Sequence, residues 1–207
     1  MIELVHAVRD VLLVPRCAGC GEPGAWFCFA CRDLCDPVSH GGPLPVRGAG
    51  TYAGPLRGAL HRLKYGGERG LADDLGALVA LEVARDLARG IVLDAVVPVP
   101  LHRARALSRG YDQAALLAQA VAIRTGLPLR LPLRRVRAGR PQVELDRAAR
   151  AANVRSAFVA EAGSLRRLRV ALVDDVATTG ATIADAAAAA RAAGARAMRA
   201  YVVAVDA

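Results

Sequence analysis

Near the C-terminus, two adjacent carboxylates and a loop of small hydroxyl residues follow an apolar run. Asp174 and Asp175 come directly after the predicted strand 169–173. The loop that follows comprises Ala177, Thr178, Thr179, Gly180, Ala181 and Thr182. Ligands of open α/β sheets bind at the carboxyl ends of strands, and the start of the next helix offers free N–H groups and a positive dipole to a phosphate. Because carboxylates accept hydrogen bonds from sugar hydroxyls, the string predicts a sugar 5-phosphate site.

Three arginines, Arg103, Arg105 and Arg109, follow a second predicted strand at 91–97. Arginine binds phosphate oxygens in bidentate fashion, so Arg103 and Arg109, together with Lys64, are predicted to bind a pyrophosphate group. Solvated surface arginines, and a lysine that extends from a helix end to solvent, are the alternatives. For Gln113 a role in the site and a helix cap stay equally open. His102 is expected to be structural or exposed, and Tyr65 and Tyr111 to be packing residues.

All five cysteines lie between residues 17 and 35, and four of them form two Cys-x2-Cys pairs: Cys17 with Cys20, and Cys28 with Cys31. Each pair lets two thiolates reach one ion from a tight turn, and two pairs complete the tetrahedral four-sulfur set that zinc prefers. The spacing predicts a structural zinc site without chemistry of its own, because four protein ligands close the coordination sphere. Two disulfides, a redox pair and an iron–sulfur cluster are the alternatives. The roles of Cys35 and His40 stay open.

The positive charge of the chain is concentrated in one stretch. The 207 residues carry a net charge of +9, and residues 130–169 hold eleven arginines against three carboxylates, a net charge of +8. Such clustering favours a polyanionic partner such as phosphate, pyrophosphate or nucleic acid. A compositional bias toward arginine is the alternative for residue type, since Lys64 is the only lysine. It does not explain the clustering.

The elements that must position these residues alternate along the chain. Beyond a linker at 37–45, we predict strands at 46–52, 91–97, 169–173 and 198–205 and helices at 54–64, 71–89, 112–125 and 182–193. Alternation of strands and helices predicts a mostly parallel α/β sheet flanked by helices. An amphipathic helix at 2–13 precedes the cysteines. The predicted domains are therefore a zinc-knuckle module at 1–45 and an α/β domain at 46–207.

Composition excludes several classes of protein. With 54% apolar residues the chain can bury a sizeable core, which excludes wholesale disorder. No run reaches the roughly 18 apolar residues of a membrane span. The N-terminus lacks the positive charge of a secretory signal, so a cytoplasmic location is expected. Neither a Walker loop nor a GxGxxG fingerprint is present.

Several segments carry a resemblance to known families. The string Asp-Asp-Val-Ala-Thr-Thr-Gly-Ala-Thr at 174–182 resembles the phosphoribosyl-diphosphate (PRPP) signature of type I phosphoribosyltransferases. Residues 97–113 resemble the pyrophosphate loop of the ComF family, which usually has Asn in place of Asp112. The block at 142–158, the Leu63-Lys64 pair with Gly67, and the four-cysteine knuckle also resemble that family. The resemblance covers nearly the whole chain.

The resemblance implies a type I phosphoribosyltransferase-like fold and a competence-associated protein. It implies that Asp174 and Asp175 are catalytic and hold the ribose, that the loop binds the 5′-phosphate, and that Mg²⁺ accompanies PRPP. Residues 134–153 would close over the site as a lid. The leading hypothesis is transfer of phosphoribosyl to an unidentified acceptor with release of pyrophosphate. The alternative is a non-catalytic factor that binds single-stranded DNA during DNA uptake, together with other competence proteins.

Overall fold

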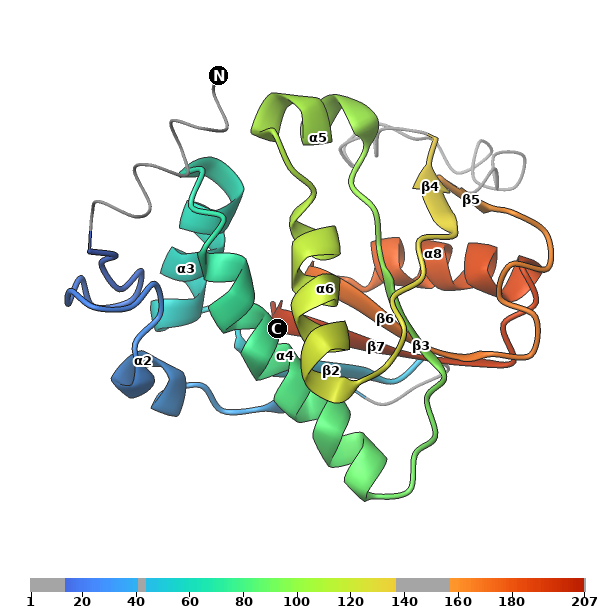
Figure 1. Cartoon of the computed structure of the whole chain (residues 1–207), viewed down its shortest axis with the longest axis horizontal. Coiled ribbons are helices and arrows are strands. Elements are labelled where there is room, and N and C mark those ends of the chain that lie inside the picture. The colour runs from blue at the N-terminus through green and yellow to red at the C-terminus, as the bar shows by residue number, and fades with distance from the viewer. Residues whose placement is uncertain (1–13, 41–43, 137–156, 207) are drawn as a thin grey trace.

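The computed structural model describes residues 14–40, 44–136 and 157–206, and the predicted helix 2–13 lies outside them. Five strands form one sheet in the order β1-β2-β7-β6-β3 (Figure 1). These strands are β1 (Val38–His40), β2 (Val46–Thr51), β7 (Ala197–Val205), β6 (Arg169–Ala177) and β3 (Ala95–Pro98). The last four run parallel, and β1 pairs antiparallel with β2 at the edge. This mostly parallel sheet confirms the fold class that the sequence predicts.

Helices cover both faces of the sheet. Three of them, α3 (Gly54–Tyr65), α4 (Leu71–Ala88) and α6 (Gln113–Thr125), lie on the face toward the viewer of Figure 1. Their apolar side chains form one core with the sheet, in which Leu60, Val79 and Tyr201 are fully buried. The opposite face packs against α8 (Ala181–Ala192). A separate antiparallel pair, β4 (Leu133–Arg135) and β5 (Phe158–Ala160), also packs against α8.

Two local expectations differ from the structure. The strand predicted at 91–97 begins only at Ala95, because Gly90, with a φ of 82°, ends α4 and the next residues turn back. In that turn Ile91 donates its N–H to the carbonyl of Asp86. A helix that the sequence did not predict, α5 (Arg103–Arg109), follows β3. It has no buried residue and therefore no apolar pattern that would reveal it.

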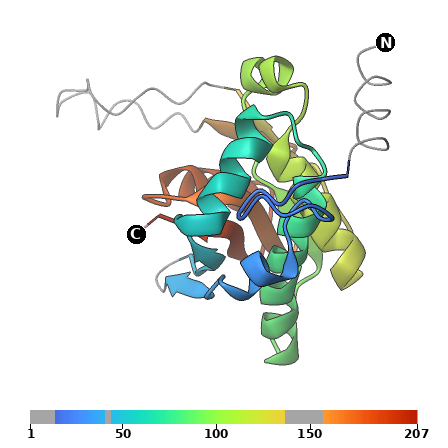
Figure 2. The ribbon, with the colours of Figure 1, turned by 90° about the vertical axis from the view of Figure 1, so that its left-hand side faces the viewer.

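The cysteine-rich segment packs directly onto the α/β unit. Cys17, Phe27 and Cys31 belong to the same buried cluster as the helices of the front face. The short helix α2 (Phe29–Asp33) follows the second cysteine pair, and Arg32 forms an ion pair with Asp74 of α4. Figure 2 shows this segment against α3 and α4. The domain boundary near residue 45 stays a prediction. Buried residues on both sides of it belong to one hydrophobic core.

Among the described residues, no helix combines the length and apolar character that crossing a membrane requires.

Candidate phosphate site and metal site

A polar pocket of about 210 Å³ lies at the carboxyl edge of the sheet, where β3 and β6 end. Residues from seven elements or their ends line it, although they are far apart in the sequence. The charged and polar ones are Lys64, Arg105, Arg109, Gln113, Arg135, Asp174, Asp175 and Thr182. The fold therefore brings together the acidic pair, the end of α3 and part of the arginine cluster.

Asp175 is the anchor of this pocket. Its side chain is 9% exposed. One carboxylate oxygen, Oδ1, lies 3.0 Å from Lys64 Nζ, and the other, Oδ2, accepts a hydrogen bond of 2.7 Å from Gln113 Nε2. Lys64, in the last turn of α3, thus points into the pocket with its side chain 17% exposed. Because a cation and an amide hold both oxygens, the orientation of Asp175 is fixed before any ligand binds.

Asp174 has a different environment. Its Oδ1 accepts a hydrogen bond of 2.8 Å from the backbone N–H of Asp175. Burial, followed by the charge of Asp175, raises the pKa of Asp174 well above its usual range. Asp174 therefore retains a proton more readily than an exposed carboxyl group and can then donate a hydrogen bond.

The predicted loop 177–182 comprises the last residue of β6, the turn at 178–180 and the first two residues of α8. Gly180 is the N-cap of α8 with a φ of 73°, a left-handed conformation that favours glycine, and no side chain caps the helix. Within the described part of the chain, the backbone N–H groups of residues 178–180 donate no hydrogen bond. Thr182 lines the polar pocket, whereas Thr178, Thr179 and Gly180 line a neighbouring hollow of about 400 Å³. Free N–H groups at a helix start can bind a phosphate.

The structure separates the predicted pyrophosphate-binding arginines. Arg109 is half-buried, its guanidinium lies 5.0 Å from the centroid of the Tyr65 ring, and its Nη1 is buried without a hydrogen-bond partner among the described residues. Arg103 is exposed at the start of α5 and does not line the pocket. Arg105 lines it instead, and Arg135 of β4 completes the cationic wall.

The loop between β3 and α6 is held by Asp112, the residue that departs from the family pattern. One of its oxygens accepts from the N–H of Leu101 at 2.8 Å, and the other accepts from the N–H of Ala115 at 3.2 Å. Asp112 is thus the N-cap of α6, and Gln113 is free to contact Asp175. His102 caps α5 through Nδ1, which accepts from the N–H of Ala104 at 3.3 Å. The structure gives His102 a structural role.

The four cysteines of the two pairs meet at one point. The sulfurs of Cys17, Cys20, Cys28 and Cys31 all lie within 4.8 Å of one another, and those of Cys20 and Cys28 are 3.6 Å apart. A tetrahedral site with zinc–sulfur bonds of about 2.3 Å places its sulfurs about 3.8 Å apart, so the set fits such a metal. No disulfide joins the cysteines of the described segments.

Backbone donors favour the thiolate of Cys17, whereas burial and the neighbouring cysteines raise the pKa of Cys31. Burial raises the pKa of the Cys17 thiol, but N–H groups of Cys28, Cys20 and Gly19 outweigh it and lower the pKa to about 6. Hydrogen bonds of this kind favour a thiolate, the form that binds metal. Cys35 lies outside the cluster and donates its S–H to the carbonyl of Cys31 at 3.3 Å. The described cysteines thus divide into four that can hold a metal and one that does not join them.

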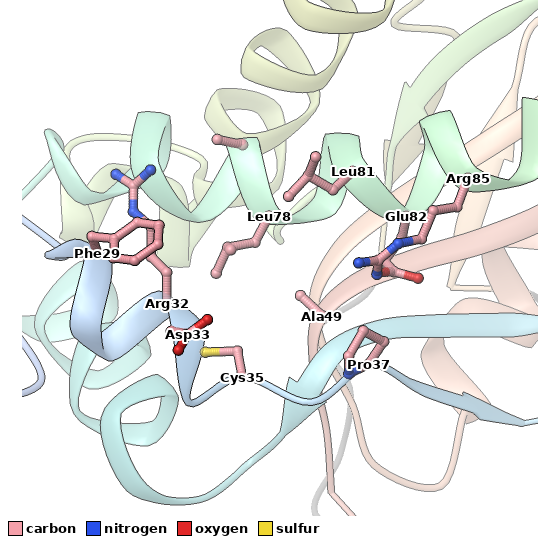
Figure 3. Close-up of a pocket in the computed structure, with 11 residues that line it drawn as sticks. Phe29, Arg32, Asp33, Cys35, Pro37, Ala49, Leu78, Leu81, Glu82 and Arg85 are labelled. Atoms are coloured by element: carbon pink, nitrogen blue, oxygen red, sulfur yellow. The ribbon is translucent and has the colours of Figure 1, made fainter. Parts of the chain in front are cut away.

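A third hollow, of about 350 Å³, lies between α2 and α4 (Figure 3). Leu78 and Leu81 of α4 and Phe29 of α2 form its apolar wall, and Glu82 with Arg85 stands at one end. Cys35 lines it. It contains none of the residues that the sequence predicts for phosphate or metal binding.

Several curated bacterial proteins are similar to this chain over most of its length. Competence protein F of Haemophilus influenzae is 30% identical over 181 residues, which are 84% of this chain and 78% of that protein. The DNA utilization protein YhgH of Salmonella typhimurium is 34% identical over 186 residues, 87% of this chain and 78% of that protein. YhgH of Escherichia coli K12 is 33% identical over 181 residues, with shares of 82% and 74%. No protein-family model matches the chain.

Solved structures give more distant similarities. An allosteric regulatory enzyme of purine biosynthesis and the glutamine PRPP amidotransferase from B. subtilis, complexed with ADP and GMP, are each 28% identical with a TM-score of 0.46. Each match covers 64% of this chain and about a quarter of the other chain, 25% and 26% respectively.

Proposed function

The chain belongs to the ComF family, that of competence protein F and YhgH, and from this premise we propose that it binds PRPP, or another ribose 5-phosphate, at the carboxyl edge of its sheet. The observation that carries the proposal is the division of the polar pocket. Asp174 and Asp175 offer oxygens near the end of β6, Arg105, Arg109 and Arg135 offer cations, and Lys64 joins the two groups through its ion pair with Asp175. A ribose with phosphates at both ends has matching groups.

Each part of the ligand has a counterpart in the pocket. The free N–H groups of the loop 177–182 suit the 5′-phosphate. The acidic pair suits the ribose hydroxyls, because carboxylates accept hydrogen bonds from them. Arg109 and Lys64, with Arg105 and Arg135, suit the pyrophosphate group. The unpartnered Nη1 of Arg109 supports this assignment, since a buried cationic donor is costly without an acceptor.

We propose that the chemical step is phosphoribosyl transfer. A nucleophile on the acceptor forms a bond to the anomeric carbon, and the carbon–oxygen bond to pyrophosphate breaks with its electron pair on the leaving group. The residues named above would contribute positioning and neutralisation of the charge that develops on pyrophosphate. The proposal concerns the donor half of the reaction and names no acceptor.

Mg²⁺ would enter with the ligand. Both oxygens of Asp175 are engaged by Lys64 and Gln113, so within the pair Asp174 would hold the hydrated ion, whose charge would favour the ionised form of this carboxyl group. This fits an ion that keeps most of its ligands as water and substrate phosphate oxygens. When bound, Mg²⁺ supplies positive charge to the diphosphate.

Calorimetric titration of PRPP with Mg²⁺ tests the donor site. Asp175→Asn is expected to weaken binding by about 1–3 kcal/mol, the range for a lost charged hydrogen bond. Asp73→Asn is the matched control, because Asp73 pairs with Arg124 on the surface away from the pocket. An assay of pyrophosphate release with a panel of bases then tests transfer. No binding of PRPP or ribose 5-phosphate at millimolar concentration would refute the proposal.

We also propose that the four-cysteine cluster holds a structural zinc ion, at about one per chain. The unpaired thiols of the described segments support a reducing compartment such as the cytoplasm. Metal analysis of the purified protein tests the zinc. Cys28→Ser should lose the metal and Cys35→Ser should keep it, whereas equal loss in the two variants would contradict the assignment.

A second candidate function, binding of single-stranded DNA, is favoured by arginines at the opposite edge of the sheet. Arg166 and Arg167, before β6, and Arg196, before β7, are exposed, and the N–H of Arg167 donates to the carbonyl of Gly194. Arg167 has a φ of 64°, where a non-glycine residue costs about 1–2 kcal/mol. An arginine in this costly backbone conformation supports a role for its side chain. The names of the relatives, competence and DNA utilization, fit this candidate.

The fold divides the arginine-rich stretch, so two groups of arginines can be tested separately. Arg134 and Arg135 of β4 lie near the pocket, whereas Arg137 and Arg140 of the predicted lid lie outside the described residues.

If the opposite edge binds DNA, Arg167→Gly with Arg196→Gln should lower the affinity for single-stranded DNA and flatten its salt dependence by about 0.7 per lost contact. Arg167→Gly relieves backbone strain, so the fold should persist. Neutralising Arg134, Arg135, Arg137 and Arg140 should affect pyrophosphate release instead. Unchanged DNA binding in the edge variant would contradict this candidate.

A further inference from the structure

Gln113 has a buried side chain, and only its amide nitrogen has a partner in the site described above. Its side chain lines the polar pocket, and the residue is 4% exposed. The amide nitrogen Nε2 donates to Asp175 Oδ2 at 2.7 Å. The amide oxygen Oε1 is buried and has no hydrogen-bond partner among the described residues.

The neighbours of Gln113 fix which way its amide faces. An ionised carboxylate only accepts hydrogen bonds, so the NH₂ group and not the oxygen must face Asp175. Lys64 Nζ lies 3.0 Å from the other oxygen of Asp175, and an ammonium group only donates, so both oxygens of Asp175 act as acceptors. Asp112 caps α6, so the fold does not need Gln113 for that purpose. The unpartnered oxygen is therefore turned away from Asp175.

A buried acceptor without a donor is rare, because it loses its hydrogen bond to water and gains nothing. The donor that Oε1 lacks in the free protein is expected to come from the ligand. The phosphate groups of a ribose phosphate carry acceptor oxygens and cannot supply it. Its ring hydroxyls can, and the acidic pair beside Gln113 is the end of the pocket suited to them.

We propose that Gln113 Oε1 accepts a hydrogen bond from one ring hydroxyl of the bound ribose, and that Gln113 thereby sets the preference for ribose over a deoxyribose. This inference rests on the proposed function, since it concerns the same pocket. It adds a residue that selects the sugar, whereas the cations select the phosphates.

A substitution can remove the acceptor of the Gln113 side chain while keeping a donor for Asp175. Gln113→Lys keeps a donor for Asp175 but removes the acceptor. Its added charge should strengthen binding of every sugar phosphate to a similar extent. The informative quantity is therefore the ratio of dissociation constants between a deoxy sugar and ribose, and not either constant alone.

The experiment titrates the full-length protein with ribose 5-phosphate, 2-deoxyribose 5-phosphate and 3-deoxyribose 5-phosphate, first after dialysis into buffer without Mg²⁺, and then with Mg²⁺. The wild type is expected to bind ribose 5-phosphate about tenfold more tightly than the sugar without the contacted hydroxyl, the equivalent of one hydrogen bond. Gln113→Lys should bind the two about equally. Gln119→Lys, on the same helix but away from the pocket, should keep the wild-type ratio.

A second measurement does not depend on whether Gln113→Lys folds. The chain has three glutamines, at 113, 119 and 142, so their ¹³C-labelled side-chain carbonyls can be assigned by single substitutions at 119 and 142. Ribose 5-phosphate should shift the signal of Gln113 in the wild type, and the deoxy sugar without the contacted hydroxyl should not.

The outcomes are distinguishable. A wild type that binds neither PRPP nor ribose 5-phosphate overturns the proposed function and this inference with it. Binding with the same sugar ratio in Gln113→Lys and wild type, or equal carbonyl shifts with all three sugars, overturns the inference alone. A loss in Gln113→Lys that is equal for all sugars and occurs only with Mg²⁺ would assign Oε1 to the metal and also overturn it.

Discussion

At the scale of single residues, the acidic pair near the carboxyl end of β6 shows how one sequence motif acquires two electrostatic environments. Asp175 is compensated by Lys64 and Gln113. Asp174 is half-buried, and desolvation together with the neighbouring charge of Asp175 raises its pKa. An ionised Asp174 is therefore unfavourable in the free protein, and a cationic or hydrogen-bonding ligand would relieve that cost.

This difference predicts the pH dependence of stability. The folded protein holds the Asp174 proton more tightly than the unfolded chain, whose aspartates titrate near about 3.9. The stabilisation from this proton is complete below the unfolded pKa and is lost as the pH rises through the folded pKa. Asp174→Asn, which never ionises, is therefore expected to melt a few degrees above wild type at pH 7.5, with a smaller difference toward pH 4.

Thermal denaturation between pH 4 and 8 measures this effect. Asp73→Asn serves as a control of opposite sign, because the hydrogen bond from Arg124 lowers the pKa of Asp73. Loss of that pair should cost stability at neutral pH and less as the pH falls, by no more than about 1 kcal/mol at an exposed site. Parallel pH curves for wild type and Asp174→Asn would contradict the assignment.

At the scale of elements, the turn from β6 into α8 depends on Gly180. A Cβ added there would meet no atom of the protein, so the constraint is the backbone φ of 73°. Gly180→Ala is expected to cost about 1–2 kcal/mol of stability from the left-handed backbone and to weaken ribose 5-phosphate binding as the loop relaxes.

Gly163 provides a matched control for that variant. It has a φ of 78°, also has open space around its Cα, and lies outside the pocket. Gly163→Ala should therefore lose a similar amount of stability in denaturant titration but bind ribose 5-phosphate like wild type. Equal binding by the two variants would show that the loop conformation does not matter for the ligand.

The helix α3 connects the cysteine segment to the pocket. Its Gly58 lies so close to the segment that an added Cβ would come within 2.8 Å of the carbonyl oxygen of Ala18. Arg62 donates to the carbonyl of Arg16 at 3.2 Å, and the last turn carries Lys64 to Asp175. Tyr111, in the loop before α6, donates its hydroxyl to the carbonyl of Leu63. Displacement of the cysteine segment would therefore move a pocket residue.

Loss of the metal is accordingly expected to weaken PRPP binding, about tenfold or more, although no cysteine touches the pocket. Cys20→Ser should lose the metal and increase hydrogen exchange in α3, and Cys35→Ser should do neither. Gly58→Ala should keep the metal yet weaken binding, since the added methyl group pushes α3 away. Wild-type affinity in both Cys20→Ser and Gly58→Ala would mean that α3 is positioned independently of the segment.

The particular residues show what the sequence could and could not predict. The strand and loop at 169–182 and the four-cysteine set were predictable, because each is a local pattern of residue types. The contact of Gln113 with Asp175 joins residues 62 positions apart, and only the parallel order of β3 and β6 brings them together. Arg105 lines the pocket and Arg103 does not, because the rotation of α5 about its axis decides which side chains face the pocket. The sequence does not reveal that rotation, since α5 has no buried residues.

At the scale of the whole molecule, the cysteine segment and the α/β unit share one core. Cys17, Phe27 and Cys31 are buried together with residues of α3 and α4, and β1 extends the main sheet. Elements that share a core unfold together. We expect a single cooperative transition for the metal-loaded protein and a lower midpoint for the entire chain after removal of the metal, rather than separate melting of residues 1–45.

Calorimetry with and without a strong zinc chelator, combined with circular dichroism of the helices, tests this expectation. Two resolved transitions, of which only the smaller responds to the chelator, would contradict it.

The shared core also has a consequence for how much of the protein a cell can maintain. A metal that binds only the folded chain adds to its stability in proportion to the logarithm of the free metal concentration, about 1.4 kcal/mol for each tenfold rise above the dissociation constant. Because folded proteins are only marginally stable, a loss of this size raises the unfolded fraction about tenfold and exposes it to proteases. Under metal starvation the steady-state abundance of the whole chain should therefore fall, and with it every activity the chain carries, before any ligand site is directly affected.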